Sequence, residues 1–212
     1  KKTLADVEYR LPSTIAPTFQ HIHLNIDPDN PTYSGKTNID ITVKTPTKKV
    51  GFYQQDLTVT SARLVSGSSS FPLNVTIGEY DINWGESQDE IAPGKYTLEI
   101  TFEGKVNTSS DGMYLSRFEE TNYIFTQFED MHARKAFPSF DEPNFKIPYQ
   151  MTISSPEHQE IVGNTPVEKV TVENGIKTVV FEKTKPMPTY LIAYTVGPFD
   201  SAEISGLSVP GK

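Results

Sequence analysis

Cysteine is absent from the 212-residue sequence, so no disulfide can hold the fold together and the redox compartment stays open. Long apolar runs are absent as well: none approaches the roughly 20 residues that a membrane-spanning helix needs, so no membrane span is expected. Basic residues are in the minority, with 19 Lys and Arg against 27 Asp and Glu and a net charge of −8. Because no basic stripe is available to neutralise phosphates, we expect no nucleic-acid partner.

Motifs of several enzyme classes are also missing. No serine lies in a G-x-S-x-G or S-x-x-K pattern, and the sequence has no glycine-rich phosphate loop. The four histidines form no H-E-x-x-H zinc motif. His21 and His23 stand two residues apart on one predicted strand face, but tetrahedral zinc needs a third protein ligand and none is identifiable nearby. We therefore expect ordinary strand histidines, and no catalytic residue or metal ligand in this chain.

A 3.6-residue apolar period is almost absent, and alternation of apolar and polar residues takes its place. This alternation predicts strands over 18–27, 33–44, 50–53, 57–65, 95–106, 113–118, 147–155, 168–172 and 176–183, and residues 71–84 are expected to form a hairpin pair around Gly78. Residues 85–94 form a polar loop, whereas 189–199 is nearly unbroken apolar sequence and predicts a strand buried on both faces. Twelve Phe and ten Tyr can supply a substantial core. We predict an all-β, mostly antiparallel domain, a sandwich or a saddle, with one short helical turn near residues 130–136.

The chain is organised around residues 121–146, which read TNYIFTQFEDMHARKAFPSFDEPNFK. The first part alternates as a strand and places Gln127 and Glu129 on one face, about 7 Å apart. A carboxylate just ahead of a helix N-terminus tends to stay ionised, because the positive end of the helix dipole favours it. Glu129 is therefore either a functional anion or a solvated acid at a strand-to-helix corner.

The second part of this stretch predicts the short helical turn and a fixed loop. Asp130 has the side chain of an N-cap, and Arg134 and Lys135 suit the negative end of the dipole in the last turn. Asp141 and Glu142 resemble a pair of catalytic carboxylates, but adjacent residues on an extended chain seldom have the geometry that acid–base chemistry needs. We expect Asp141 to anchor the loop by accepting backbone N–H bonds.

Three stretches resemble a signature of the gluzincin zinc aminopeptidases. The family reads T-Q-x-E/Q, A-R and F-P-C-F/W-D-E-P, then M-S-T-Y-L-x-A-F-x-V-G further along. The matching residues here are TQFE at 126–129, AR at 133–134, FPSFDEP at 137–143, MPTYLIAYTVG at 187–197, and an opening with Leu11-Pro12, Pro17 and Tyr33-Ser34-Gly35. Ser139 and Pro188 depart from the pattern at positions that carry no chemistry in the family.

The resemblance implies the saddle-like N-terminal β-domain of a zinc-dependent aminopeptidase, in which Glu129 and Gln127 cap the free amine of a peptide substrate. It implies that the zinc, the general base and the transition-state tyrosine lie in a catalytic domain beyond residues 196–199. The β-domain would span 1–199, and 200–212 would begin the linker to that missing domain. The expected partners are the peptide substrate and the catalytic domain, and the chain alone is expected to hold no zinc and to be inactive.

A second hypothesis stays open beside this one: a non-catalytic β-sandwich that serves adhesion or carbohydrate recognition. The run from 126 to 143 separates the two, because a generic sandwich has no reason to carry it. The compartment is also open. A start at Lys1 with no apolar run behind it fits an exported protein that has lost its signal peptide, which slightly favours the periplasm or the extracellular space over the cytoplasm.

Overall fold

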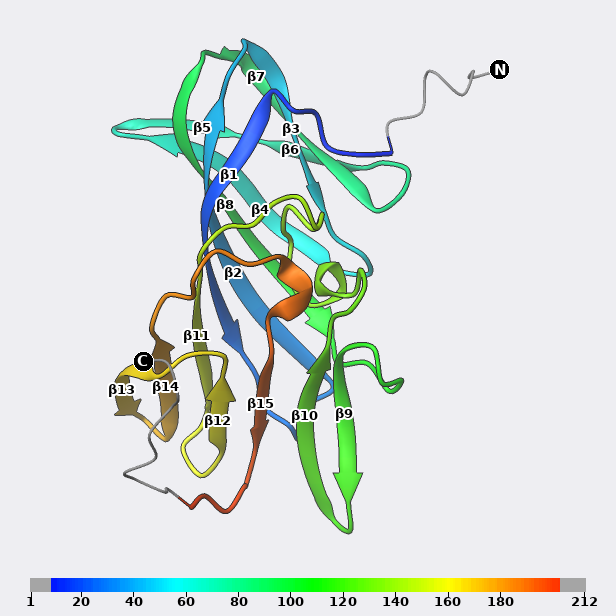
Figure 1. Ribbon diagram of the computed structural model, residues 1–212, viewed down its shortest axis with the longest axis vertical. Coiled ribbons are helices and arrows are strands. Elements are labelled where there is room, and N and C mark those ends of the chain that lie inside the picture. The colour runs from blue at the N-terminus through cyan, green and yellow to red at the C-terminus, as the bar shows by residue number, and fades with distance from the viewer. Residues whose placement is uncertain (1–8, 203–212) are drawn as a thin grey trace, which may run out of the picture.

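The computed structural model describes residues 9–202, which fold almost entirely as β-strands (Figure 1). The strands are β1 (Ile15–Asn25), β2 (Thr32–Val43), β3 (Thr47–Tyr53), β4 (Thr58–Ser66), β5 (Ser69–Pro72), β6 (Asn74–Ile77), β7 (Ile82–Ile91), β8 (Gly94–Lys105), β9 (Gly112–Phe118), β10 (Thr121–Gln127), β11 (Tyr149–Pro156), β12 (Glu160–Gly163), β13 (Val167–Glu173), β14 (Ile176–Phe181) and β15 (Tyr194–Gly197). Two 3-10 turns complete the described chain, η2 (Ala133–Lys135) and η3 (Thr189–Leu191). The predicted all-β class is confirmed.

One large sheet and two small ones build the molecule. The large sheet has eight strands in the order β13-β14-β11-β1-β2-β8-β4-β5, and its long strands run the length of Figure 1. A three-stranded sheet, β3-β7-β6, lies at one end of it, and a four-stranded sheet, β12-β15-β10-β9, lies at the other. Every strand pair is antiparallel except β1 with β11, which is parallel. The mostly antiparallel prediction therefore holds, with one parallel pair inside the large sheet.

Each small sheet closes its own hydrophobic core against the same face of the large sheet. The β10 core contains Ile22, Leu24, Phe102, Ile124, Phe128 and Phe137 among others. The β7 core contains Ile39, Ile41, Leu64, Leu98, Phe52 and Ile82 among others. Strand β2 serves both: its Tyr33 faces the β10 core, and Ile39 and Ile41, further along the same face, enter the β7 core. Alternation of apolar and polar residues along β2 is what permits this.

A buried polar seam lies between the two cores. The Gln20 side-chain amide donates hydrogen bonds to the Thr37 hydroxyl (2.7 Å) and to the Pro138 carbonyl (2.9 Å). Both Gln20 and Thr37 are fully buried, so these bonds replace the water that the polar groups lose on folding. The loop that follows Pro138 crosses the seam, because Phe137 packs in the β10 core and Phe140 in the β7 core.

Three local predictions were wrong. Residues 85–94 are not a loop, since β7 continues to Ile91, whose side chain is buried. Residues 189–199 are not one buried strand: η3 comes first, Leu191 is exposed, and β15 starts at Tyr194. Asp130 is not an N-cap, because η2 begins three residues later, with His132 at the capping position and no side-chain cap bond. The expected linker falls mostly on 203–212, outside the described residues.

Candidate functional site

Strand β10 brings the predicted site residues to the end of the four-stranded sheet. It pairs with β9 over its whole length, from Thr121 opposite Phe118 to Gln127 opposite Gly112. The strand ends at Gln127, and Phe128 then turns inward, where its ring meets Phe137 with 5.7 Å between ring centroids. Phe128 is only 2% exposed. This anchored aromatic ring fixes the point at which the chain leaves the sheet.

Gln127 and Glu129 flank this anchor, and both are exposed. The strand prediction was wrong in one respect: Glu129 is not in β10 but in the turn that follows, so the two side chains do not continue one strand face. Within the part of the chain that the structure describes, neither side chain has a hydrogen bond or an ion pair. The site thus presents an exposed carboxylate and an exposed amide, two residues apart in the chain, on the segment 127–129, which we call the lip.

The basic side chains that follow Glu129 in the chain are already paired. Lys135 and the Ser109 hydroxyl both bind the Asp111 carboxylate, which holds the pKa of that carboxyl below its usual value. His132 adds a contact from its Nδ1 to the same carboxylate at 3.7 Å. Because the Lys135 ammonium group forms its ion pair with Asp111, it does not neutralise the Glu129 carboxylate. An incoming cation would meet an uncompensated anion there.

A buried ion pair supports the turn from beneath. The Arg134 guanidinium donates from Nε to Asp141 Oδ2 at 2.8 Å and from Nη2 to the Asp141 carbonyl at 2.9 Å, and it lies over the Tyr53 ring, 4.1 Å from the centroid. The Arg134 backbone N–H also donates to Asp141 Oδ2, at 3.3 Å. Asp141 therefore does accept a backbone N–H, as expected. Its second oxygen accepts from the Thr189 hydroxyl in η3.

Arg134 lies in the last turn of η2, as predicted. Its side chain is 6% exposed and forms an ion pair with Asp141, a partner that the sequence did not predict. Glu142 is equally structural: its Oε1 accepts from the Leu11 backbone N–H (2.8 Å) and from the Tyr53 hydroxyl (3.0 Å). Burial, and then the Glu142 carboxylate, raise the pKa of the Tyr53 hydroxyl. Neither carboxylate is free for acid–base chemistry.

The two strand histidines lie away from this site, on the opposite face of the large sheet. His21 Nε2 shares a hydrogen bond with the Thr152 hydroxyl (2.9 Å), and His23 Nε2 shares one with the Ser154 hydroxyl (3.0 Å). Burial lowers the pKa of both imidazoles. Across residues 9–202, no group of three His, Cys, Asp or Glu side chains is arranged to hold a metal ion. The same residues contain no helix long and apolar enough to cross a membrane.

The fold and the motif segment together define a β-domain of the peptidase M1 class. The family model described as Peptidase M1 N-terminal domain matches residues 16–191, and the chain belongs to this family. The match covers the three-stranded sheet, the four-stranded sheet except β15, the buried ion pair and the exposed lip.

Three curated relatives of this chain are named as aminopeptidases. The chain is 34% identical over 199 residues to Aminopeptidase M1-D of Oryza sativa subsp. japonica, and 34% identical over 211 residues to Glutamyl aminopeptidase of Sus scrofa. It is 32% identical over 203 residues to Aminopeptidase N of Acetobacter pasteurianus. Each comparison covers 92% of this chain, but only 23%, 22% and 56% of the respective relative. The chain therefore spans about a quarter to a half of the length of these relatives.

Proposed function

We propose that this chain is the N-terminal domain of a zinc-dependent aminopeptidase, and that Glu129 and Gln127 receive the free amine of the peptide substrate. The observation that carries the proposal is Glu129 itself, an exposed carboxylate with no partner among residues 9–202. It stands on a turn held by the buried Phe128 ring and by the Arg134–Asp141 pair. The role goes to a group that is rigidly presented and electrically unsatisfied.

The physical logic follows from what an aminopeptidase must measure. It removes one residue from the free end, so it has to recognise the α-ammonium group and place the first peptide bond at a fixed distance from it. A carboxylate fixed on a rigid turn does this, because a charge-assisted hydrogen bond forms only with substrates that bear the ammonium. The Gln127 side-chain oxygen can accept a second N–H. Covering the lip with the rest of the longer protein would exclude water and strengthen both interactions.

The zinc would be held by the rest of that longer protein. The described residues do not offer a zinc site, since His21 and His23 are bonded to Thr152 and Ser154 and no third ligand joins them. The role proposed for this chain, binding of the substrate amine, requires no metal. We therefore expect the 212-residue chain alone to be inert.

The inertness of the isolated chain is the first prediction. After dialysis against a chelator and then against zinc-containing buffer, the purified chain should retain no stoichiometric zinc and should not hydrolyse an aminoacyl reporter substrate. Metal content is measured by atomic absorption and activity by reporter fluorescence. Stoichiometric zinc that resists dialysis, or activity that returns with zinc, would contradict the assignment.

The second prediction concerns Glu129 in the longer enzyme. Removing one partner of a desolvated charge pair costs about 2–5 kcal/mol. Glu129→Ala should therefore lower kcat/KM by roughly 30-fold to several thousand-fold, by transition-state arithmetic. Glu129→Gln should lose less, because its amide oxygen still accepts from the ammonium, and Gln127→Ala should fall between Glu129→Gln and wild type. Zinc content and thermal stability should not change.

The controls separate amine recognition from a general effect of charge. Asp130→Ala removes an exposed acid from the same turn and should leave kcat/KM near wild type. A substrate with an acetylated N-terminus should be poor for every variant, because it lacks the ammonium. A Glu129→Ala enzyme with near-wild-type kcat/KM on free-amine peptides would show that Glu129 is a solvated corner acid, for which the change costs less than about 0.5 kcal/mol.

A further inference from the structure

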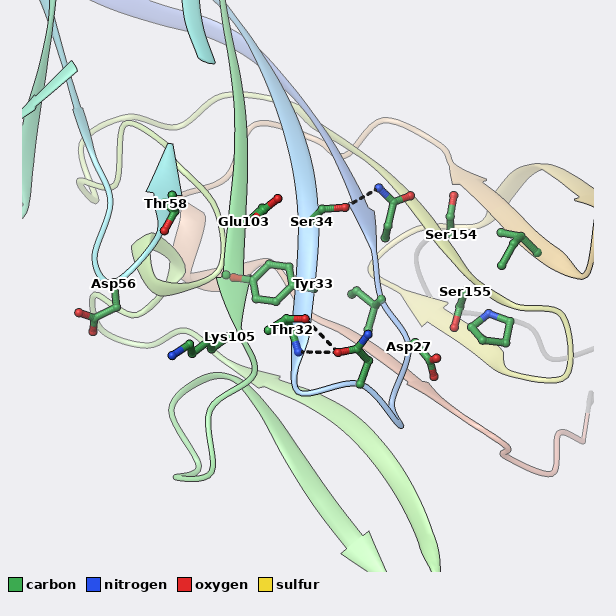
Figure 2. Close-up of a pocket in the computed structure, with 16 residues that line it drawn as sticks. Asp27, Thr32, Tyr33, Ser34, Asp56, Thr58, Glu103, Lys105, Ser154 and Ser155 are labelled. Carbon is green, nitrogen blue, oxygen red and sulfur yellow. Dashed lines mark hydrogen bonds between the residues drawn. The ribbon is translucent and has the colours of Figure 1, made fainter. Parts of the chain in front are cut away.

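The large sheet also carries a cavity, lined by residues other than the two proposed to bind the amine. A cavity of about 570 Å³ lies on the sheet face opposite the two cores, across the ends of β11, β1, β2, β8 and β4 (Figure 2). This volume lies within the range of about 300–1,000 Å³ that is typical of ligand pockets. No step of the proposed peptidase role uses it.

Strand register makes the floor of this cavity a regular array of polar side chains. One transverse row crosses five strands, each member directly opposite the next: Ser154, Asn25, Ser34, Glu103 and Thr58. A second row follows about 7 Å further along the strands and contains Asp27, Thr32, Lys105 and Asp56. Figure 2 shows both rows, the first above the second. Members of the first row lie on paired strands about 4.8 Å apart, as do Thr32 and Lys105 in the second. Asp27 and Asp56 lie just outside β1 and β4.

The two halves of the array differ in how they are bonded. On β11, β1 and β2 the side chains hold one another: the Asn25 amide donates to the Ser34 hydroxyl at 3.1 Å, and Ser154 shares a hydrogen bond with Thr178 at 2.8 Å. On β8 and β4, Glu103 and Thr58 have no such bond within residues 9–202. One half is therefore preorganised, and the other half offers free acceptors and donors to a ligand.

The chemistry of the rows favours a ligand that bears hydroxyl groups. Hydroxyl and amide side chains both donate and accept, as sugar hydroxyls do, and a carboxylate such as Glu103 can accept from two adjacent hydroxyls at once. Charge excludes an anionic ligand: three carboxylates line the cavity, on Asp27, Asp56 and Glu103, against one ammonium, on Lys105. A neutral or amino-bearing ligand suits this balance.

An extended peptide fits this floor poorly. Peptides that bind sheets add a strand at a free edge, where backbone N–H and C=O groups are unpaired, and place alternate side chains in apolar pockets. Strands β11, β1, β2 and β8 are each paired on both sides, whereas β4 has β8 on one side and β5 on the other only over Arg63–Ser66. Four of the five strands therefore offer no backbone to a peptide. The array runs across the strands and presents side chains alone.

We propose that this cavity is a binding site for a short oligosaccharide, neutral or bearing amino groups, which lies across the strands and is read by the two polar rows. The assignment does not depend on the peptidase role. It gives the domain a second contact surface, lined by residues other than Gln127 and Glu129.

The test is a titration of the isotopically labelled 212-residue chain with four probes, followed by the backbone amide signals in NMR spectra. The probes are a glucosamine trisaccharide, an N-acetylglucosamine trisaccharide, a galacturonic acid trisaccharide and a basic peptide of lysine and glycine. We expect one or both of the first two to shift signals of Asn25, Ser34, Thr58 and Glu103 and to saturate. Glu103→Gln should weaken that binding roughly tenfold, as expected when a hydrogen bond to a charged group is lost.

Glu86→Gln is the matched control, an exposed acid on β7 at the other end of the molecule, and should bind as wild type does. Both variants replace exposed carboxylates and should keep the wild-type melting temperature. The proposal is overturned if neither amino-bearing nor neutral sugar shifts these signals, if only the galacturonic acid probe or the basic peptide does, or if Glu103→Gln binds as tightly as wild type.

Discussion

Asp141 is the residue at which the sequence motifs of this chain meet. Its carboxylate binds the Arg134 side chain of η2, 7 residues before it in the chain, and the Thr189 hydroxyl of η3, 48 residues after it. The AR, DEP and MPTY segments are thus parts of one buried polar cluster. The Asp141-Glu142 motif resembles a pair of catalytic acids, but in this fold Asp141 supports the turn that follows Glu129.

The third prediction follows for the Arg134–Asp141 pair. Their side chains are 7% and 2% exposed, so removing one partner leaves an uncompensated buried charge. Asp141→Asn should destabilise the folded chain by about 3–5 kcal/mol, measured as the free energy of unfolding in urea. Arg134→Met together with Asp141→Leu removes both charges and should cost less than the sum of the single changes, because no charge is left unpaired.

Strictly additive single changes would contradict this account, since additivity is the behaviour of residues that do not interact. Asp56→Asn serves as the control: Asp56 is exposed, and the change should stay within about 0.5 kcal/mol of wild type.

The sequence carried part of this residue-scale result. It identified Asp141 as a loop anchor, with Pro143 fixing the exit of the loop, and it predicted that Asp141 and Glu142 are not a catalytic pair. It did not identify Arg134 as the partner, because a cation in a short helical turn has a sufficient local explanation in the helix dipole. Whether Arg134 interacts with the helix dipole or with a carboxylate depends on how deeply its side chain is buried, and that is known only from the folded structure.

At the scale of elements, alternation predicted most strands but not which strands pair. The parallel pair of β1 with β11 joins segments about 130 residues apart, with His21 opposite Gln150 and Asn25 opposite Ser154. Alternation assigns a face to each residue and says nothing about its neighbour across the ladder. The errors at 85–94 and 189–199 have a similar origin: the polar second half of β7 belongs to a strand whose ladder with β3 shifts register there, and the apolar run is interrupted by one turn.

The β1–β11 pair supports a fourth prediction, on pH. Its outward ladder places His21 and His23 in hydrogen bonds with Thr152 and Ser154. Burial lowers the pKa of both histidines, and for His21 the nearby His23, Lys183 and Lys36 lower it further. The unfolded state therefore binds more protons, so the stabilisation is present above the unfolded pKa of 6.5 and is lost as pH falls through the lower folded values.

The free energy of unfolding in urea should consequently fall between pH about 7.5 and about 5.5, above the range where most carboxylates titrate. A His21→Gln/His23→Gln variant keeps hydrogen-bonding side chains but cannot titrate, and its stability should change less over the same interval. An equal pH dependence in both proteins would assign the effect to other groups.

On the scale of the whole molecule, two cores share one sheet and are linked at a polar seam. Burial of Gln20, Thr37 and Ser139 in that seam means that neither core continues into the other as apolar packing. The segment 137–140 links the two cores, because Phe137 packs in one and Phe140 in the other. The Arg134–Asp141 ion pair holds this segment in place. Composition predicted a substantial core, but nothing in a linear pattern divides that core in two.

The last prediction tests this coupling. The single Trp, Trp84, packs against the β7 core, so its fluorescence reports on that half of the molecule, while far-UV circular dichroism reports on all strands. In the wild-type chain the two signals should give one coincident transition in urea, the behaviour of a two-state domain. Asp141→Asn loosens the segment that joins the cores and should separate the two midpoints, beyond the overall loss of stability. Coincident midpoints in the variant would show that the shared strands β2 and β8 alone couple the two halves. Separate midpoints in the wild-type chain would show that the seam does not couple them.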